Sequence, residues 1–289
     1  MHDALKQVLS ELSTLKVAVI GETIMDEFIP VRYQGQSMKS FCPVFELVDG
    51  KVERQNGGAM AITRHLEGFV SKVETFSNSP LDIVKTRYAD HLSGQKHLEF
   101  NHFNREKFQK VSIDTSDYDV VIVADFGHGF CDKLEINDGF HLMCQTNSQN
   151  FGFNRLSKWK HKQKKSVCID LREASLQINH RIDDCTDDLM RKLYNYELNS
   201  EDLFVTLGKQ GAVYTNGKTV DRHQTFATQI VDTIGAGDAF FSFAAICSAL
   251  GLENKLYLPS LAASLSTTWL CNQNAVNPEN LTNHANRFL

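Results

Sequence analysis

Short apolar segments rich in β-branched residues recur along this chain of 289 residues, and stretches with helical spacing separate them. A strand that is apolar along its whole length must be buried on both faces, and intervening helices provide that cover and make successive strands parallel. The pattern therefore predicts an α/β fold with a parallel sheet covered on both faces. The segments are residues 16–20, 120–124, 166–170 and 203–207.

Polar or glycine-bearing turns follow each of these four segments. In parallel sheets, ligands bind beyond the carboxyl ends of the strands. The sequence therefore predicts a site that is assembled from several strand ends. The turns are residues 21–26, 125–129, 170–173 and 208–211.

Two stretches, about 30–55 and 84–108, lack helical periodicity and mix aromatic, apolar and charged residues. We interpret them as extended strands that form a small β-layer, or lid, over the site, with apolar residues left for a homodimer contact. An irregular surface insertion is the alternative interpretation. The rest of the chain shows no repeat or linker, so residues 1–289 are expected to form one domain.

The bulk composition limits the partners and the compartment. A net charge of -5 and a pI near 6.1 argue against nucleic acid or an anionic membrane as the main partner. Seven cysteines without a CxxC pair indicate reduced thiols, and residues 1–15 resemble neither a secretion signal nor a membrane span. We expect a soluble, cytoplasmic protein, and we interpret the basic run 158–165 as a solvated helix end.

The segment DTIGAGDAF, residues 232–240, is a glycine-rich turn that opens into an apolar helical run. Gly235 and Gly237 lack a Cβ atom, so successive backbone N–H groups can converge on an anion at the positive end of the helix. Asp238 then stands beside a bound phosphoryl group, where a carboxylate can take the proton of an attacking hydroxyl. The alternative is a helix start with Asp238 as a capping residue.

This segment resembles the C-terminal signature of the PfkB, or ribokinase-like, carbohydrate kinases. Three further segments resemble parts of that family in the expected order: VIGETIMD (19–26), NGGAMAITRHLEGF (56–69) and VTLGKQGAVY (205–214). The resemblance implies a three-layer, doubly wound, mostly parallel sheet with a β-strand lid that often mediates dimers. It also implies ATP-dependent transfer of the γ-phosphoryl group to a hydroxyl of a sugar or sugar phosphate. CPVFELV (42–48) and KTRY (85–88) look most like the branch of heptose-phosphate kinases.

The resemblance assigns a role to each matching residue. Asp238 is the expected general base, and the backbone of Gly235, Ala236 and Gly237 is the expected anion hole. Asp26 with the pair Gly57 and Gly58 is expected to hold the acceptor.

The nucleotide and its magnesium ion are expected on neighbouring strand ends. Thr206, Gly208 and Gly211 would flank ATP, and Arg172 would reach a phosphate, although a surface ion pair is an equal alternative for Arg172. Relatives often hold Mg²⁺ through an Asn-x-x-Glu motif, which is missing between Asp170 and Val205. Glu173 is the substitute candidate, unless the ion is held mainly by the phosphates.

Ala61 is a second departure, because many relatives have an asparagine there that contacts the sugar. The two departures keep two alternatives open: a catalytically silent sugar- or nucleotide-binding relative, and a kinase of a nucleoside or other non-sugar alcohol. A dinucleotide-binding oxidoreductase is a poor alternative, since no GxGxxG motif follows the first strand.

Overall fold

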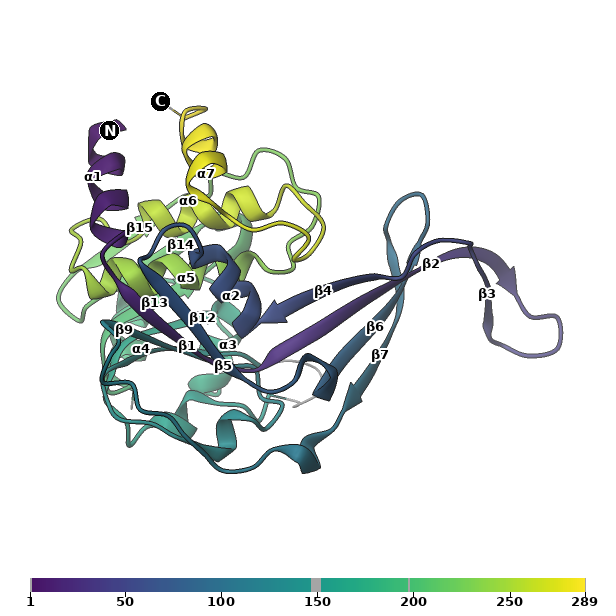
Figure 1. Ribbon diagram of the computed structural model, residues 1–289, viewed down its shortest axis with the longest axis horizontal. Coiled ribbons are helices and arrows are strands. Elements are labelled where there is room, and N and C mark those ends of the chain that lie inside the picture. The colour runs from purple at the N-terminus through teal and green to yellow at the C-terminus, as the bar shows by residue number, and fades with distance from the viewer. Residues whose placement is uncertain (1, 147–151, 197, 289) are drawn as a thin grey trace.

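A central sheet of eight strands organises the protein in the computed structural model, which describes residues 2–146, 152–196 and 198–288 (Figure 1). The strand order is β15-β14-β13-β12-β11-β9-β1-β5. The six strands from β13 to β5 are parallel, whereas β14 and β15 are antiparallel and form one edge. The strands are β1 (Lys16–Gly21), β5 (Lys72–Ser77), β9 (Val120–Asp125), β11 (Phe140–Cys144), β12 (Lys164–Asp170), β13 (Ser200–Thr206), β14 (Ala212–Thr215) and β15 (Val220–His223).

Helices cover both faces of this sheet. Successive side chains of a strand point to opposite faces. On β13, Phe204 accordingly packs in one apolar cluster, and Leu203 and Val205 pack in the other. The prediction of a three-layer, doubly wound, mostly parallel fold is therefore confirmed. The first cluster includes residues of α1 (His2–Leu12), α2 (Ala59–Leu66), α5 (Ala236–Ala249), α6 (Tyr257–Ser266) and α7 (Pro278–Ala285), and the second those of α3 (Leu171–Gln177) and α4 (Asp187–Asn195).

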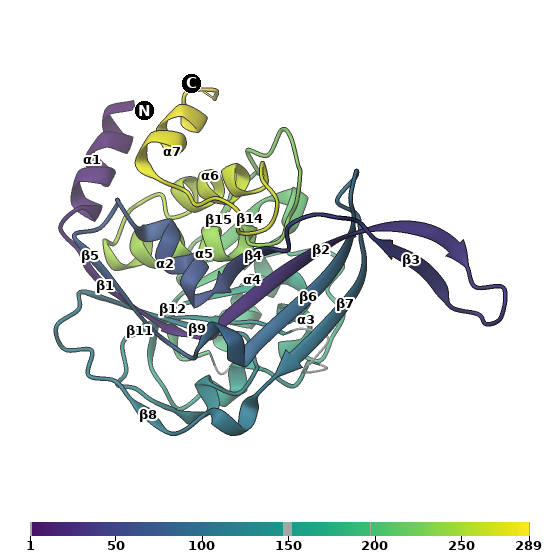
Figure 2. The same cartoon turned by 45° about the vertical axis from the view of Figure 1, so that its right-hand side comes forward.

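A second sheet of five strands projects from the side of the central sheet (Figures 1 and 2). Its long strand β2 pairs with β3, β4 and β6, and β7 continues from β6. The strands are β2 (Thr23–Gln36), β3 (Pro43–Leu47), β4 (Glu53–Gly58), β6 (Ile83–Asp90) and β7 (Lys96–Phe103). A small separate pair joins β8 (Val111–Ser112) and β10 (Leu134–Glu135).

The turn expected at residues 21–26 is wrong. β1 ends at Gly21 and β2 begins at Thr23, so Asp26 lies within a strand. The residues of 23–28 pair with β4 on one side, and from Met25 onward they pair with β6 on the other, so backbone hydrogen bonds hold this polar segment extended. The second sheet thus starts seven residues before the stretch that the sequence indicated.

The basic run 158–165 is largely exposed and follows a short helical turn, as expected, but two of its lysines have buried partners. Lys164 is 1% exposed, and its ammonium donates to the backbone carbonyls of Trp159 and Lys162. Lys158 pairs with the fully buried Asp125 at 2.6 Å. A buried ammonium is tolerated when carbonyl or carboxylate oxygens replace its water, and charge patterning alone does not reveal such partners.

Asp125 and Glu22 form a buried acidic pair at the ends of β9 and β1. With Cys131 they offer three ligand atoms within 4.8 Å of one another. The chain itself compensates Asp125, because the ammonium of Lys158 forms an ion pair with it and the indole N–H of Trp159 donates a hydrogen bond to it. Burial and Asp125 raise the pKa of Glu22 to about 7, against the backbone N–H groups that bind it. We therefore interpret this cluster as structural.

Candidate active site

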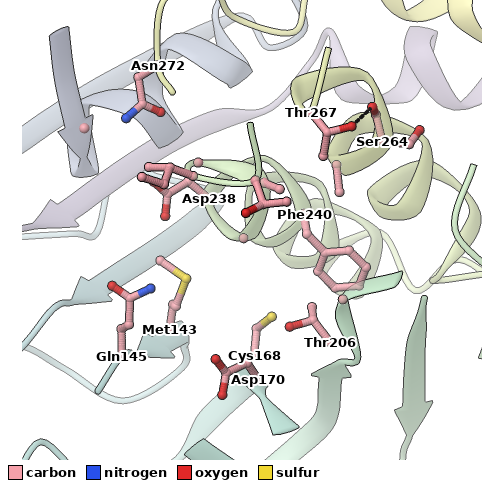
Figure 3. A pocket seen from close by; sticks show the side chains of 18 of the residues that line it. Met143, Gln145, Cys168, Asp170, Thr206, Asp238, Phe240, Ser264, Thr267 and Asn272 are labelled. Carbon is pink, nitrogen blue, oxygen red and sulfur yellow. Dashed lines mark hydrogen bonds between the residues drawn. The ribbon is translucent and has the colours of Figure 1, made fainter. Parts of the chain in front are cut away.

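A pocket of about 660 Å³ lies between the carboxyl ends of the central strands, the start of α5 and the near end of the second sheet (Figure 3). Residues from both sheets and from the helical layer line it together. Of the twelve site residues that the sequence indicated, eleven line this pocket, and Arg172 does not. Arg172 is exposed on the first turn of α3.

Asp238 occupies the first turn of α5, where the helix begins at Ala236. Gly235 precedes the helix with φ 85°, a left-handed conformation, and a Cβ at this position would stand 2.6 Å from Oδ1 of Asn272. Only glycine therefore fits this turn without a shift. The added Cβ of Gly237 would meet nothing within 4 Å, so the backbone there faces open space.

The Asp238 carboxyl group is 8% exposed, and its pKa is raised to about 7. Burial is the main cause and the charge of Asp26 adds to it, while Lys85 and the backbone N–H of Gly58 oppose it. A carboxyl group with this pKa exchanges protons near neutral pH. Such a group suits general base chemistry better than a permanently ionised helix cap.

Asp232, the first residue of the same segment, has an organising role. Its Oδ1 accepts the backbone N–H groups of Thr233 and Ile234 at 2.8 and 3.2 Å. Its Oδ2 accepts the N–H of Cys271 at 3.3 Å and the ammonium of Lys96, from β7, at 2.8 Å. One side chain thus ties the glycine turn to the loop after α6 and to the second sheet.

Asp26 faces the pocket from β2 and is 4% exposed. Its Oδ1 forms a short ion pair with Nη1 of Arg87, and Nε of Arg87 donates to Glu99 at 2.9 Å. The family resemblance implies that Asp26 helps to hold the acceptor. In the structure one of its two oxygens is engaged by a buried guanidinium.

The glycine pair Gly57 and Gly58 ends β4 where that strand approaches β2. Gly58 has φ 67°, and a Cβ there would stand 2.2 Å from the carbonyl oxygen of Glu22. At Gly57 a Cβ would stand 2.9 Å both from Asp26 Oδ2 and from Asn272 Nδ2. Backbone packing therefore requires glycine at position 58, whereas a Cβ at position 57 would have to displace the side-chain ends of Asp26 and Asn272.

Asn272 lies in the loop after α6, between the two glycine segments, and is 4% exposed. Its backbone N–H donates to Gln55 and its carbonyl accepts Arg64, at 2.8 and 2.9 Å. In the described part of the chain its buried Oδ1 has no hydrogen-bond partner. Figure 3 shows its side chain near Asp238 at the same end of the pocket.

The opposite end of the pocket is lined by hydroxyls, glycines and an aromatic ring, with Asp170 and Lys209 as charged neighbours. Thr206 ends β13, and Gly208 and Gly211 follow it in a tight turn. Ser264 and Thr267 of the helical layer face this end across Phe240 (Figure 3). Hydroxyls, glycine backbone and an aromatic ring can accommodate a nucleoside without adding charge.

Glu173 lines the pocket, but both of its oxygens already bind backbone. Oε2 accepts the N–H of Asp170 at 2.7 Å in a capping box, and Oε1 accepts the N–H of Thr146 at 2.9 Å. Burial and Asp170 raise its pKa to about 8, which favours a neutral acid at physiological pH. The neighbouring carboxylate of Asp170 also lines the pocket and keeps Oδ2 without a hydrogen bond from the described residues.

Among the pocket residues that were missed as site residues, Lys85, Arg87 and Asn272 lie at the end beside Asp26 and Asp238. A signal existed for the first two, because residues two apart on a strand point to the same face, and both are cationic. No local signal marks Asn272, which lies 34 residues after Asp238 in the sequence and reaches the pocket only through the packing of the loop after α6.

Comparison with known proteins agrees with this geometry. The sequence of part of the chain matches the profile described as pfkB family carbohydrate kinase. The match extends over residues 167–269. This span includes the strand end at Thr206, the glycine turn and Asp238.

Among curated proteins, the sequence similarity to this chain is local. An ATP-dependent 6-phosphofructokinase of Thermoanaerobacterium thermosaccharolyticum is 48% identical over 46 residues, which are 16% of this chain and 14% of that protein. The match therefore spans only a small part of the curated relative.

Among solved structures, the similarity extends over nearly the whole chain. A putative ribokinase from Agrobacterium tumefaciens has a TM-score of 0.67 and 14% identity, covering 96% of this chain and 99% of its own. Arabidopsis thaliana ribokinase, solved with ribose and ATP, has a TM-score of 0.62 and 13% identity, covering 94% and 99%. The expected ribokinase-like fold is confirmed, whereas the heptose-phosphate branch stays a prediction.

None of the helices in the described part of the chain combines the length and the apolar character that crossing a bilayer requires.

Proposed function

We propose that this protein is an ATP-dependent kinase that transfers the γ-phosphoryl group to a hydroxyl of a sugar or sugar phosphate. The observation that carries the proposal is the placement of Asp238 at the start of α5. There it lies between a glycine turn suited to an anion and a polar pocket end that includes Asp26 and Asn272. The pfkB domain match and the ribokinase-like fold support the same chemistry.

In this proposal Asp238 is the general base. It takes the proton of the acceptor hydroxyl as that oxygen attacks the γ-phosphorus, and the bond from phosphorus to the β,γ-bridging oxygen breaks. The N–H groups of Gly235, Ala236 and Gly237 would stabilise the charge of the transferred group, with help from the positive end of the α5 dipole. Asp26, Gly57, Gly58 and Asn272 would orient the acceptor.

ATP would occupy the end with Thr206, Gly208 and Gly211, as the ATP complex of the Arabidopsis ribokinase suggests by its similar fold. Mg²⁺ would neutralise charge on the phosphates, and it needs few protein ligands. Asp170 is the carboxylate in place for that ion, and Glu173 would join it only after losing its proton, through the lone pairs that its backbone hydrogen bonds leave open. Arg172 does not line the pocket, so it would reach a phosphate only from outside it.

The test is an acceptor screen with purified protein, ATP and Mg²⁺, measuring ADP release. The panel contains ribose, fructose 6-phosphate, heptoses, heptose phosphates and a nucleoside. We expect turnover with at least one sugar or sugar phosphate and a loss of about 10²- to 10⁴-fold in kcat for Asp238→Asn. Asp221→Asn, an exposed change on β15, is the matched control and should keep full activity.

Two outcomes would contradict the proposal. Full turnover by Asp238→Asn would remove Asp238 from the chemistry. Nucleotide binding by calorimetry without turnover of any acceptor would favour the silent relative, for which the double engagement of Glu173 is the one structural argument.

We also infer a cytoplasmic homodimer that forms through the second sheet. All seven cysteines are free, and the outer part of this sheet exposes large apolar side chains. Phe41 is 99% exposed and Leu47 68%. Such a patch is expected to bury itself against another surface. Sedimentation of the wild type and of Phe41→Ser tests this inference, since a monomeric wild type would contradict it.

A further inference from the structure

Lys85 and Arg87 bring two positive charges to the acceptor end of the pocket. They are two residues apart on β6, so both side chains point to the same face of the second sheet. Lys85 is directly opposite Asp26 of β2 in the strand register. All three residues line the pocket together with Gly57 and Asp238.

Two carboxylates hold the guanidinium of Arg87 in place, but one of its nitrogens remains available as a hydrogen-bond donor. Nη1 binds Asp26 and Nε binds Glu99, and the side chain as a whole is 8% exposed. Nη2 makes no hydrogen bond within the described residues. A guanidinium fixed on two sides and open on the third is preorganised to bind one more anionic oxygen.

Lys85 differs from the other lysines that are removed from solvent. In the described chain, Lys96 and Lys255 pair with carboxylates, and Lys162 and Lys164 donate to backbone carbonyls. Lys85 is half-buried and has neither a hydrogen bond nor an ion pair with a described residue. Burial lowers the pKa of Lys85, which shows that its charge is poorly compensated.

The carboxylates nearby do not supply the missing partner. Asp26 and Glu99 are both engaged by Arg87. Asp238 forms no ion pair with Lys85, and its own raised pKa makes it a weak counter-charge near neutral pH. An anion from outside the chain would compensate Lys85 and fill the open side of Arg87.

We propose that the phosphoryl acceptor is itself anionic, with a phosphate or carboxylate group that Lys85 and Arg87 bind at the end of the pocket beside Asp26. This inference rests on the proposed kinase function and narrows it from sugars in general to acidic sugars. Lys85 is then a specificity-determining residue that acts on acceptor affinity. The hydroxyl that reacts is a different part of the same molecule, next to Asp238.

Matched pairs of acceptors test the inference. Ribose against ribose 5-phosphate and fructose against fructose 6-phosphate vary the phosphate, and glucose against gluconate varies the carboxylate. We expect kcat/KM to be at least about 100-fold higher for the charged member of one pair. The pair that shows the preference identifies the anionic group. Equal or better turnover of the neutral members would overturn the inference.

Lys85→Met provides the second measurement. We expect KM for the anionic acceptor to rise about 10- to 100-fold, with kcat and the KM for ATP little changed. Because the substitution removes a poorly compensated charge, Tm should stay the same or rise. Lys51→Met, an exposed change between β3 and β4, is the control and should alter neither the acceptor KM nor the Tm. An unchanged acceptor KM in Lys85→Met would contradict the inference.

Failure of the proposed function is distinguishable from failure of this inference. If no acceptor supports ADP release, the kinase proposal fails, and calorimetric binding of fructose 6-phosphate still tests the anionic subsite. Binding that Lys85→Met weakens about 10-fold or more would support the subsite without turnover. Equal binding of fructose and fructose 6-phosphate by the wild type would overturn it.

Discussion

The two ends of the pocket are built in opposite ways. The end beside Thr206 uses short turns of the central sheet and hydroxyls of the helical layer, and its charged residues, such as Asp170 and Lys209, lie at strand ends and turns. The end beside Asp238 combines charged residues from two strands of the second sheet, β2 and β6, with the glycine pair of β4, the start of α5 and a distant loop. Loss of one partner at the charged end leaves an uncompensated charge, whereas loss of a hydroxyl at the other end costs one hydrogen bond. The two ends should therefore respond very differently to substitution.

Asp26→Asn should give the largest effect on stability. It breaks the buried pair with Arg87 and leaves the guanidinium with Glu99 alone, which should cost about 3–5 kcal/mol in the free energy of unfolding. Urea unfolding of wild type and variant measures the difference. The neighbouring Glu27→Gln is the control, because its partner Arg54 is 62% exposed and the pair is expected to contribute less than about 1 kcal/mol. Similar losses in both variants would contradict the contrast.

The pH dependence should isolate Asp238. With a pKa of about 7, the base loses its ionised form as pH falls, so kcat/KM should drop about tenfold per unit and about 100-fold at pH 5. A pH profile of acceptor turnover measures this fall. A profile that stays flat between pH 5 and 8 would mean that this carboxyl group does not act as the base.

The same pKa has an opposite consequence for stability. The folded pKa lies above the ordinary value of 3.8, so the folded state binds the proton more tightly and loses stability as pH rises from about 4 to about 7. Asp238→Asn removes that penalty. Its Tm should therefore exceed that of the wild type more at pH 8 than at pH 4, and calorimetry at the two values checks the order.

Asn272→Ala should have an intermediate effect at the charged end. Removing a buried carboxamide oxygen that faces this end and has no hydrogen-bond partner in the described chain should raise acceptor KM about 5- to 100-fold and leave the KM for ATP unchanged. Asn137→Ala, an exposed change, is the control. An ATP KM that rises in parallel would show that the loop serves both ends.

Thr206→Val should give the smallest change. One hydroxyl is replaced by a methyl of similar size, so the KM for ATP should rise about fivefold and acceptor KM should not move. Initial-rate kinetics with either substrate varied separates the two values. A larger shift in acceptor KM than in ATP KM would contradict the assignment of the two ends.

The same contrast explains what the sequence could predict. The central sheet followed from its apolar segments, and the turn around Gly235 followed from local glycine spacing, because both depend on neighbours in sequence. The pairing of Asp26 with Arg87 could not be predicted, since it joins β2 to β6 across 61 residues. The polar segment 21–26 was predicted to be a turn, because local composition cannot show that β4 and β6 pair with it on either side.

The strand β11 was overlooked for a related reason. It contains His141, a polar residue that burial would ordinarily exclude, yet its ring binds the hydroxyl of Ser166 at 2.8 Å. Burial lowers the pKa of this histidine to about 3, so it stays neutral inside the sheet. A pattern of residue types cannot anticipate a hydrogen bond that makes a polar residue acceptable in the core.

The direct passage from β1 to β2 has a mechanical consequence. Only Glu22 separates the two strands, it is fully buried, and its carboxylate accepts the N–H groups of His128 and Phe130. The second sheet is therefore joined to the core by an almost continuous extended segment, which hydrogen bonds hold in place at Glu22. A movement of that sheet large enough to admit a sugar would also displace β1. We therefore expect the site to open by bending of the strands, coupled to the core, and not by rotation about a flexible hinge.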